Sequence, residues 1–524
     1  VSDDPWNALE HYADFMKPQR KLAPIINGWC SWFVYYGGVS EAEVLKNAEY
    51  IARELKPYGM DWVQIDDGFY RAFGDWEGNE RFPNGMKHTA DEIRKLGLKP
   101  GLWIAPYCIS EQSEIATKHP EWLVQDPNGG PQKIEQAHLA QAKYILDVTH
   151  PAAQQWLSQQ FKTMAQDWGY RFIKTDFVEW TLLAAGQFHD PTVTKSQAYR
   201  LGDQLMRDAM GSDAHFLDCG PGNEVVGLID SMRIGLDRPD DLPKFQLWDQ
   251  YAGHANSTIP SVAKRYYFHN RTWINDPDHL RTSRLSIPQA QAAATIVALS
   301  GGTTISGDKL YALDRERLDI IRKVLPSYGQ AARPIDLFEN PLAELFALPV
   351  HTAWGDWTVV ANFNAKDAAS QRKLDFARVG LDAKKRYLVY DFWTQQLIDG
   401  DGDESGGYAT SVAPTSVSLV AIREKTGAPQ LLGTDRHVIQ GAVELADVRW
   451  DAATQSLTGV ALGAPGMKWR LAVYVPNGYR FDQKDSRAAS NLSEISVDAH
   501  VLRAGVQFAD AVERVQWSLR FEKP

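Results

Sequence analysis

The chain has few cysteines, no long hydrophobic run and no excess of positive charge. Its three cysteines, Cys30, Cys108 and Cys219, are too few and odd in number for a disulfide framework, so they leave the cellular compartment open. No apolar stretch reaches the length of a membrane-spanning helix. The net charge of −11 argues against a nucleic-acid partner. These absences predict a soluble protein, secreted, periplasmic or cytoplasmic, and Val1 in place of Met is consistent with a removed leader.

Metal-ligand spacing is also missing. His119, His215 and His269 have no second ligand at a metal-binding interval, so we expect neither a metal nor another cofactor. There is no internal repeat and no low-complexity tract. Tryptophan, in contrast, is abundant, with 18 residues. Such residues build large aromatic cores, and they also provide flat surfaces for sugar rings.

Short apolar runs alternate with amphipathic helical patterns over roughly the first 300 residues, as in a (β/α)₈ barrel. One of the helical patterns begins after Ser40, a suitable N-cap with Glu43 three positions on, and stops near Gly59. A doubly wound sheet is the alternative that the pattern leaves open. The eight expected strands are Pro24–Trp32, Met60–Ile65, Lys99–Pro106, Tyr170–Phe177, Ala214–Cys219, Ile229–Leu236, Arg271–Asn275 and Ala292–Ile305.

The pattern changes after about Pro334, where helical periodicity nearly disappears and short alternating runs are separated by glycine-rich turns. This predicts antiparallel sandwich-like units, divided near Gly427-Ala428-Pro429. The predicted fold class is α/β, a (β/α)₈ TIM barrel followed by C-terminal antiparallel β-sandwich domains. The expected divisions are a lead-in over 1–22, the barrel over 23–334, a β-sandwich over 335–426 and a second β domain over 427–524.

Carboxylates and tryptophans gather where the predicted barrel strands end. In the stretch from Arg171 to Trp180, Lys174 and Asp176 are two apart on one strand and therefore point to the same face. Opposite charges in a buried place are costly unless they pair or do chemistry. Active groups of such barrels lie at the carboxyl ends of the strands. A crowded acidic and aromatic site of this kind suits glycoside cleavage.

Five segments, in order and at strand positions, resemble the α-galactosidase clan of glycoside hydrolases. They are NGWCSW (27–32), VQIDDG (63–68), GLW (101–103), FIKTD (172–176) and RIGLD (233–237). KHPEW (118–122), DCG (218–220) and NDPD (275–278) add to the resemblance, which covers roughly Pro24 to Asp308. The chain looks nearest to family 36 and its raffinose-synthase-like branch, which are related to family 27.

The resemblance implies a retaining exo-acting α-galactosidase with two catalytic aspartates. Asp176 would be the nucleophile and Asp237 the general acid and base, about 5–5.5 Å apart, with Asp237 titrating above Asp176. Lys174 would bind a hydroxyl and keep Asp176 ionised. The remaining implied substrate contacts are Asp66 and Asp67 at the 4- and 6-hydroxyls, Trp103 with one or both of Trp29 and Trp32 on the ring, Cys219 and Gly220 near the 2-hydroxyl, and Arg233 orienting the sugar or Asp237.

Structural roles for some of these residues, and departures from the family pattern, keep other interpretations open. Trp29 and Trp32 could be core residues, Asp66 an N-cap, and Asp276 and Asp278 structural. Gln141 stands where many family 36 members have a substrate-contacting arginine, and no acid follows GLW. The expected partner is an α-galactoside oligosaccharide or glycan, with the oligomeric state open. The alternatives are a raffinose-synthase-type galactosyl transferase, a hydrolase for N-acetylgalactosamine or a pentopyranose, and a non-catalytic sugar-binding protein.

Overall fold

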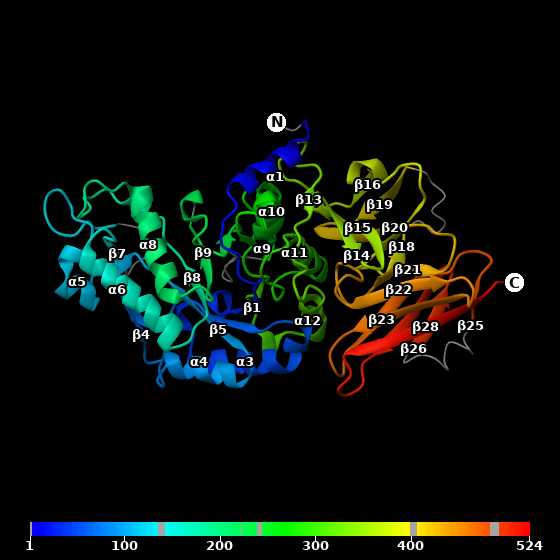
Figure 1. Cartoon of the computed structure of the whole chain (residues 1–524), viewed down its shortest axis with the longest axis horizontal. Coiled ribbons are helices and arrows are strands. Elements are labelled where there is room, and N and C mark those ends of the chain that lie inside the picture. Colours follow the sequence, from blue (N-terminus) through cyan, green and yellow to red (C-terminus); the bar gives the residue numbers. More distant parts are fainter. Residues whose placement is uncertain are drawn as a thin grey trace.

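The computed structural model describes residues 3–134, 142–220, 222–237, 244–398, 406–482 and 492–523. Eight parallel strands follow one another around a single sheet, in the order in which they occur in the chain. This is the predicted (β/α)₈ arrangement. Figure 1 shows this helix-rich part beside the strand-rich C-terminal part. The strands are β1 (Asn27–Cys30), β2 (Trp62–Ile65), β5 (Lys99–Ile104), β8 (Phe172–Thr175), β9 (His215–Asp218), β10 (Ser231–Arg233), β11 (Ile274–Asp276) and β12 (Thr304–Ser306).

The sheet closes where the last strand meets both its neighbours. β12 pairs with β1 in parallel register, Asn27 opposite Thr304. On its other side, the segment after β11 reaches it through a parallel bridge between Leu280 and Ser306. The amide of Leu280 donates to the carbonyl of Ile305 at 2.7 Å. Closure removes the free edge of the sheet and brings all eight carboxyl ends to one rim.

One predicted strand is mostly helix. The run expected to be a strand over Ala292–Ile305 is the second half of helix α11 (Ile287–Leu299), and only β12 at its end is extended. Ser286 and Gln289 form a capping box that starts the helix. Alanine is the best helix former, and this helix is rich in it. Because α11 is buried on nearly all sides and packs against a strand of the following sheet, it lacks the polar stripe that would have revealed its period.

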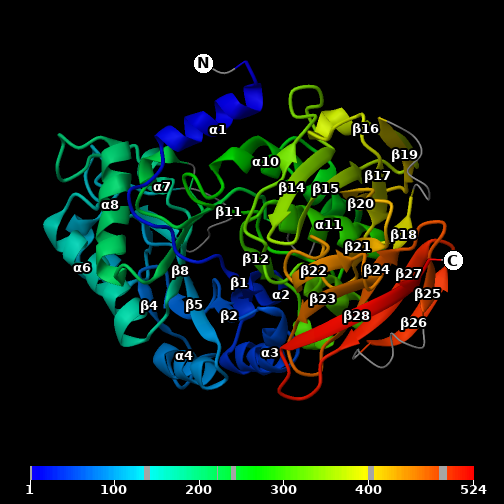
Figure 2. The ribbon, with the colours of Figure 1, turned by 45° about the vertical axis from the view of Figure 1, so that its right-hand side comes forward.

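Some helices between the strands begin at side-chain caps. The Ser40 hydroxyl accepts a hydrogen bond from the Glu43 amide at 3.4 Å, as predicted. Thr194 and Gln197 form a second capping box at α8. The lead-in contains α1 (Pro5–Phe15), capped by Asp4 and lying near α10 in both ribbon views (Figure 2). The other helices are α2 (Trp32–Tyr35), α3 (Glu41–Glu54), α4 (Met86–Lys95), α5 (Glu114–Lys118), α6 (Pro151–Lys162), α7 (Trp180–Leu183), α8 (Lys195–Met210), α9 (Lys244–Ala252), α10 (Thr258–Arg265) and α12 (Arg315–Arg322).

Antiparallel sheets follow the barrel. The first is six-stranded and accompanied by the pair β16 (Ser370–Asp375) and β19 (Gly407–Val412). Its strands, in spatial order, are β13 (Arg333–Pro334), β14 (Leu345–Thr352), β15 (Gly355–Asn364), β20 (Ser416–Glu424), β17 (Tyr387–Asp391) and β18 (Gln396–Leu397).

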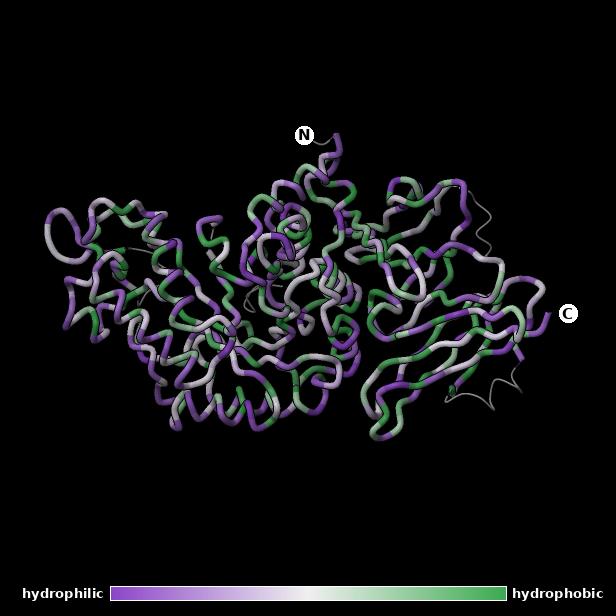
Figure 3. Tube along the Cα trace, viewed as in Figure 1, coloured by the Kyte–Doolittle hydropathy of each residue, from purple (hydrophilic) through white to green (hydrophobic). Residues whose placement is uncertain are grey.

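Two four-stranded sheets follow, and the predicted division near Gly427 falls in the loop between β20 and β21. Their facing residues share one hydrophobic cluster, the arrangement of a β-sandwich. In Figure 3 hydrophobic positions gather in the strand-rich interior, and many outer turns are hydrophilic. The sheets are β21 (Gln430–Thr434), β24 (Lys468–Tyr474), β27 (Val501–Gln507) and β26 (Leu492–Asp498), and β22 (Leu445–Asp451), β23 (Ser456–Leu462), β28 (Arg514–Glu522) and β25 (Arg480–Asp482).

Candidate active site

The site begins with a buried ion pair across the barrel rim. β2, β5 and β8 are adjacent and in register, so that Lys174 lies level with Trp103 on the neighbouring strand. Lys174 Nζ is 3.0 Å from Asp66 Oδ2, and the two side chains are 4% and 2% exposed. In this low-dielectric setting a charge without its partner would be very costly, so each holds the other in place.

Asp66 is almost fully occupied by the protein. Its Oδ2 also accepts hydrogen bonds from Gln64 Nε2 at 2.9 Å and from the Cys30 thiol at 3.2 Å. Its Oδ1 accepts the amide of Asp67 at 3.0 Å. Asp66 therefore has little capacity left for a ligand. Asp66 holds neighbouring residues of the rim in place through its hydrogen bonds, instead of being available to a ligand.

Asp67 has a different environment. The hydroxyl of Tyr70, from the hairpin of β3 (Tyr70–Ala72) and β4 (Asp75–Gly78), donates to its Oδ1. Burial raises the pKa of Asp67 to about 6, against the lowering effect of the Tyr70 hydrogen bond. Gly68 follows with φ +111°, and a Cβ there would lie 2.6 Å from Gly37 Cα. Only glycine fits this turn, which fixes where Asp67 emerges.

Asp176 is held by two N–H donors. Trp103 Nε1 donates to Oδ2 at 3.1 Å and the amide of Phe177 to Oδ1 at 2.9 Å. Phe177 has φ 52°, a costly conformation for a bulky residue and one that clusters at functional sites. Burial raises the pKa of Asp176, while the charge of Lys174 and the Trp103 hydrogen bond oppose the rise. The predicted effect of Lys174 on Asp176 is therefore present, but smaller than the effect of burial.

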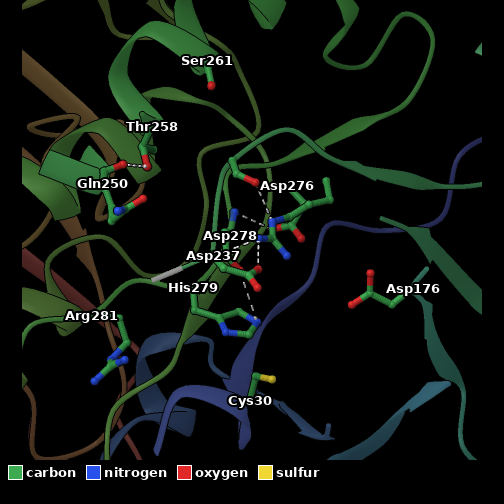
Figure 4. Close-up of polar contacts among 12 residues, drawn as sticks. Cys30, Asp176, Asp237, Gln250, Thr258, Ser261, Asp276, Asp278, His279 and Arg281 are labelled. Atoms are coloured by element: carbon green, nitrogen blue, oxygen red, sulfur yellow. Dashed lines mark hydrogen bonds and ion pairs between the residues drawn. The ribbon is translucent and has the colours of Figure 1, made fainter. Parts of the chain in front are cut away.

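Asp237 lies across from Asp176, after β10 (Figure 4). The Arg233 guanidinium donates to Asp237 Oδ1 and lies 3.2 Å from Asp278 Oδ2. The Asp237 side chain is 64% exposed and that of Asp278 is 1% exposed. Asp237 is also one of the charges that raise the pKa of Asp176, so the two carboxylates interact. Arg233 thus orients Asp237, one of the two roles that the resemblance implied.

The three tryptophans of the prediction separate into different environments. Trp103 contacts Asp176 and stacks on the Tyr70 ring, with centroids 6.2 Å apart and planes 13° apart. Trp29 is fully buried, and its indole N–H donates to the Asp308 carbonyl at 2.8 Å, so it is a core residue. Trp32 is half-buried against the apolar cluster inside the barrel, where Cys30 and Phe172 lie. Of Trp29 and Trp32, only Trp32 has exposed surface near the rim.

The turn after β9 is tightly built. Its first residue, Cys219, is half-buried and donates its amide to the Thr175 carbonyl at 3.0 Å. The amide of Gly220 donates to Asp218 Oδ1 at 2.6 Å. A Cβ on Gly220 would lie 2.2 Å from the Tyr199 hydroxyl, so a larger residue does not fit. Backbone contacts, more than side-chain contacts, therefore hold Cys219 and Gly220 directly after β9, which neighbours the strand that leads to Asp176.

Sequence reasoning missed several residues at this rim. Tyr70 lies three positions after Asp67, but nothing in the sequence shows that its hairpin folds back. Asp278 was treated as structural, and its contact with Arg233 depends on the pairing of β10 with β11. Glu179 interacts with Asp176, and burial raises the pKa of Glu179 to about 6. Its position three residues after Asp176, within the stretch from Arg171 to Trp180, was the signal in the sequence. Gln141 lies outside the described residues.

A closed parallel barrel with paired carboxylates at its carboxyl rim defines the class of protein: the architecture used by barrel glycoside hydrolases. Residues 13–210 match the Melibiase family, and residues 350–422 match the α-galactosidase C-terminal β-sandwich domain. The first part of the chain, including the N-terminal part of the barrel, is thus similar to the Melibiase family.

Relatives of known name share parts of this region. α-Galactosidase AgaA of Geobacillus stearothermophilus is 35% identical over 106 residues, which are 19% of this chain and 14% of the relative. The α-galactosidase of Escherichia coli is 25% identical over 218 residues, 39% of this chain and 28% of the relative. The matched region therefore spans less than a third of the length of these relatives.

Solved structures extend the similarity. TtGalA, an α-galactosidase from Thermus thermophilus solved with stachyose, is 28% identical with a TM-score of 0.52, covering 61% of this chain and 68% of that one. A family 27 β-L-arabinopyranosidase from Geobacillus stearothermophilus, at 21% identity, has a TM-score of 0.58 and covers 80% of this chain and 98% of its own. This second similarity concerns the fold alone.

In the part of the chain that the structure describes, no helix has both the length and the apolar character needed to cross a bilayer.

Proposed function

We propose that this protein is a retaining exo-α-galactosidase. An Asp176 oxygen attacks the anomeric carbon while Asp237 gives a proton to the departing glycosidic oxygen, leaving a galactosyl ester on Asp176. Asp237 then takes a proton from water, whose oxygen attacks the same carbon and releases galactose with its α configuration kept. The reaction needs no metal or cofactor.

The observation that carries this proposal is the setting of Asp176. Its two oxygens are fixed by Trp103 and by the Phe177 amide, at the end of a barrel strand and facing an exposed carboxylate on Asp237. A nucleophile must be held in one orientation, and an acid and base must reach both leaving group and water. A structural carboxylate needs neither the strained Phe177 nor an acidic neighbour.

The proposed galactose contacts follow from the same geometry. Asp67 is the better candidate for a hydroxyl ligand, because Asp66 is already occupied by Lys174, Gln64 and Cys30. Trp103 is 1% exposed, so it contributes by holding Asp176 through its indole N–H instead of by an open face for the ring. Arg233 holds Asp237, and the Cys219 turn lies on the strand next to the nucleophile. The names of AgaA and of TtGalA, which was solved with stachyose, support an α-galactoside as substrate.

A second candidate is a hydrolase for a pentopyranose, such as a β-L-arabinopyranoside. Its substrate would differ from an α-galactoside only in lacking the hydroxymethyl group of the sugar. The observation that favours it is the occupied state of Asp66, which leaves one fewer free carboxylate for a 6-hydroxyl. Relative rates on nitrophenyl α-galactoside and nitrophenyl β-L-arabinopyranoside separate the two candidates directly.

The nucleophile is tested with nitrophenyl α-galactoside and Asp176→Ala. We expect a loss of about 10⁴-fold or more in kcat, and equal rates would remove Asp176 from the mechanism. The matched control is Asp91→Ala on the exposed face of α4, which should leave the rate unchanged.

The Asp237→Ala variant should cleave substrates with poor leaving groups slowly, and added azide should restore part of its activity. Adding raffinose or sucrose as acceptors and measuring the products decides between hydrolysis and transfer.

A further inference from the structure

A second pair of carboxyl groups lies behind the rim, entirely out of solvent. Asp203 on α8 and Asp218 on β9 are each 0% exposed and contact one another. Tyr107 donates its hydroxyl to Asp203 Oδ1 at 2.8 Å, and Tyr199 donates to Asp218 Oδ2 at 2.6 Å. The proposed reaction uses none of these four side chains. A buried polar cluster of this size needs a physical account.

Among the described residues, no cation donates a hydrogen bond to either carboxyl of the pair. The charge of Arg207 acts to lower the pKa of Asp203, but its guanidinium gives its hydrogen bonds to Asp230 Oδ2 at 2.6 Å and to two backbone carbonyls. The other ionisable neighbours are the carboxyls of Asp176 and Glu179, which add negative charge. Two ionised carboxylates in contact, buried and with no cation hydrogen-bonded to either of them, would be prohibitively costly. One of the pair must therefore hold a proton.

The hydrogen bonds show which one. Both oxygens of Asp218 accept from donors, Oδ1 from the Gly220 amide at 2.6 Å and Oδ2 from Tyr199. Asp203 accepts only from Tyr107, on Oδ1, and its Oδ2 has no donor among the described residues. A carboxylate oxygen buried without a donor is unfavourable, whereas a carboxylic acid hydroxyl there can donate to Asp218.

We propose that Asp203 is protonated on Oδ2 and donates a hydrogen bond to the Asp218 carboxylate, and that this neutral acid is a positioning residue for the Cys219–Gly220 turn. The burial that raises the pKa of Asp203, together with the charge of Asp218, acts in the same direction. The part of this inference that concerns catalysis rests on the proposed function. The protonation itself does not.

The pair acts on the active site through the backbone. Asp218 lies opposite Thr175 in the parallel register of β8 and β9, one residue before Asp176. Asp218 also accepts the Gly220 amide, and Tyr199 fills the space where a Gly220 side chain would lie. With Asp203 neutral, the pair adds one negative charge near Asp176 instead of two. A second charge would further disfavour the ionised nucleophile.

Three variants of the full chain test the assignment. Asn at position 203 reproduces a protonated aspartate, since its oxygen can accept from Tyr107 and its amide can donate to Asp218. Asp203→Asn should therefore keep the wild-type unfolding midpoint and kcat/KM within about threefold. Asp218→Asn replaces the acceptor and should lose kcat/KM by about tenfold to a hundredfold. Asp203→Leu removes the donor and should lose both stability and activity.

An infrared spectrum gives a readout that a merely structural role would not move. At about pH 8, where Asp67 and Glu179 with pKa values of about 6 are ionised, wild type should show a protonated-carboxyl band that Asp203→Asn lacks. A band that persists in Asp203→Asn would overturn the assignment. So would the reverse pattern of activity, in which Asp218→Asn keeps wild-type kcat/KM and Asp203→Asn loses it. If no form cleaves galactosides, the infrared and unfolding results still decide it, and the proposed function alone fails.

Discussion

The buried pair of Lys174 and Asp66 makes a prediction that is independent of any substrate. Lys174→Met keeps the volume and apolar stem of the side chain but leaves Asp66 charged, 2% exposed, with only the neutral donors Gln64 and Cys30 beside the backbone. Removing one partner of a buried pair costs about 3–5 kcal/mol. We expect a loss of this size in the free energy of unfolding, measured by urea denaturation followed by tryptophan fluorescence.

The double variant Lys174→Met/Asp66→Asn removes both charges. It should be more stable than Lys174→Met alone by at least about 2 kcal/mol, because the uncompensated charge is gone. The matched control is the pair Lys87 and Asp91, with the same N–O distance of 3.0 Å but side chains 60% and 40% exposed. The same cycle there should show no measurable coupling. If the stability losses of Lys174→Met and Asp66→Asn simply add up in the double variant, burial does not make the unpaired charge costly.

Three further changes test the rim. Trp103→Phe removes a hydrogen bond that lowers the pKa of Asp176, so the acid limb of the pH profile of kcat/KM should move to higher pH; an unmoved limb would contradict the contact. Asp67 has a folded pKa of about 6, above its usual value, so the folded state binds the extra proton and stability falls as pH rises from about 4 to 6. Asp67→Asn should then raise the unfolding midpoint at pH 7 more than at pH 4, while galactoside binding weakens, and an equal change at both pH values would count against the raised pKa. Gly220→Ala places a Cβ 2.2 Å from a tyrosine hydroxyl and should lower both thermal stability and kcat/KM; Gly38→Ala, with no atom within 4 Å, is the control and should do neither.

The barrel could be predicted from the sequence because each amphipathic helix carries its own period. α3 and α8 begin at caps that are visible in the chain, and each buried strand is bounded by turn residues. α11 could not be assigned in the same way. It packs against β20, and its second half is buried on nearly all sides, so this half has no polar side and cannot be told from a long buried strand by pattern.

The sequence predicted which residues form the site, but it did not predict which of them contact one another. The five motifs named every member of the group formed by Asp66, Lys174, Trp103 and Asp176, because each stands at a strand end. They did not show that Trp29 turns into the core, since a residue at a strand end can face either the rim or the neighbouring helix. Nor did they show Tyr70, which reaches the rim only because its hairpin folds back over the barrel.

The two adjacent aspartates show why contact must come from the fold. Asp66 and Asp67 are chemically identical and consecutive, and the chain direction alone gives no reason to separate their roles. Lys174, two strands away, pairs with the first, so that its charge is matched by a buried ammonium. The second faces Tyr70 and has a pKa of about 6, because burial raises the pKa by more than the Tyr70 hydrogen bond lowers it. A sugar hydroxyl that donates to Asp67 would add a hydrogen bond to its ionised form and lower that pKa. Galactoside binding should therefore release protons between about pH 5 and 7, which calorimetry in buffers of different ionisation enthalpy measures directly; binding without proton release in that range would mean that the sugar does not reach Asp67.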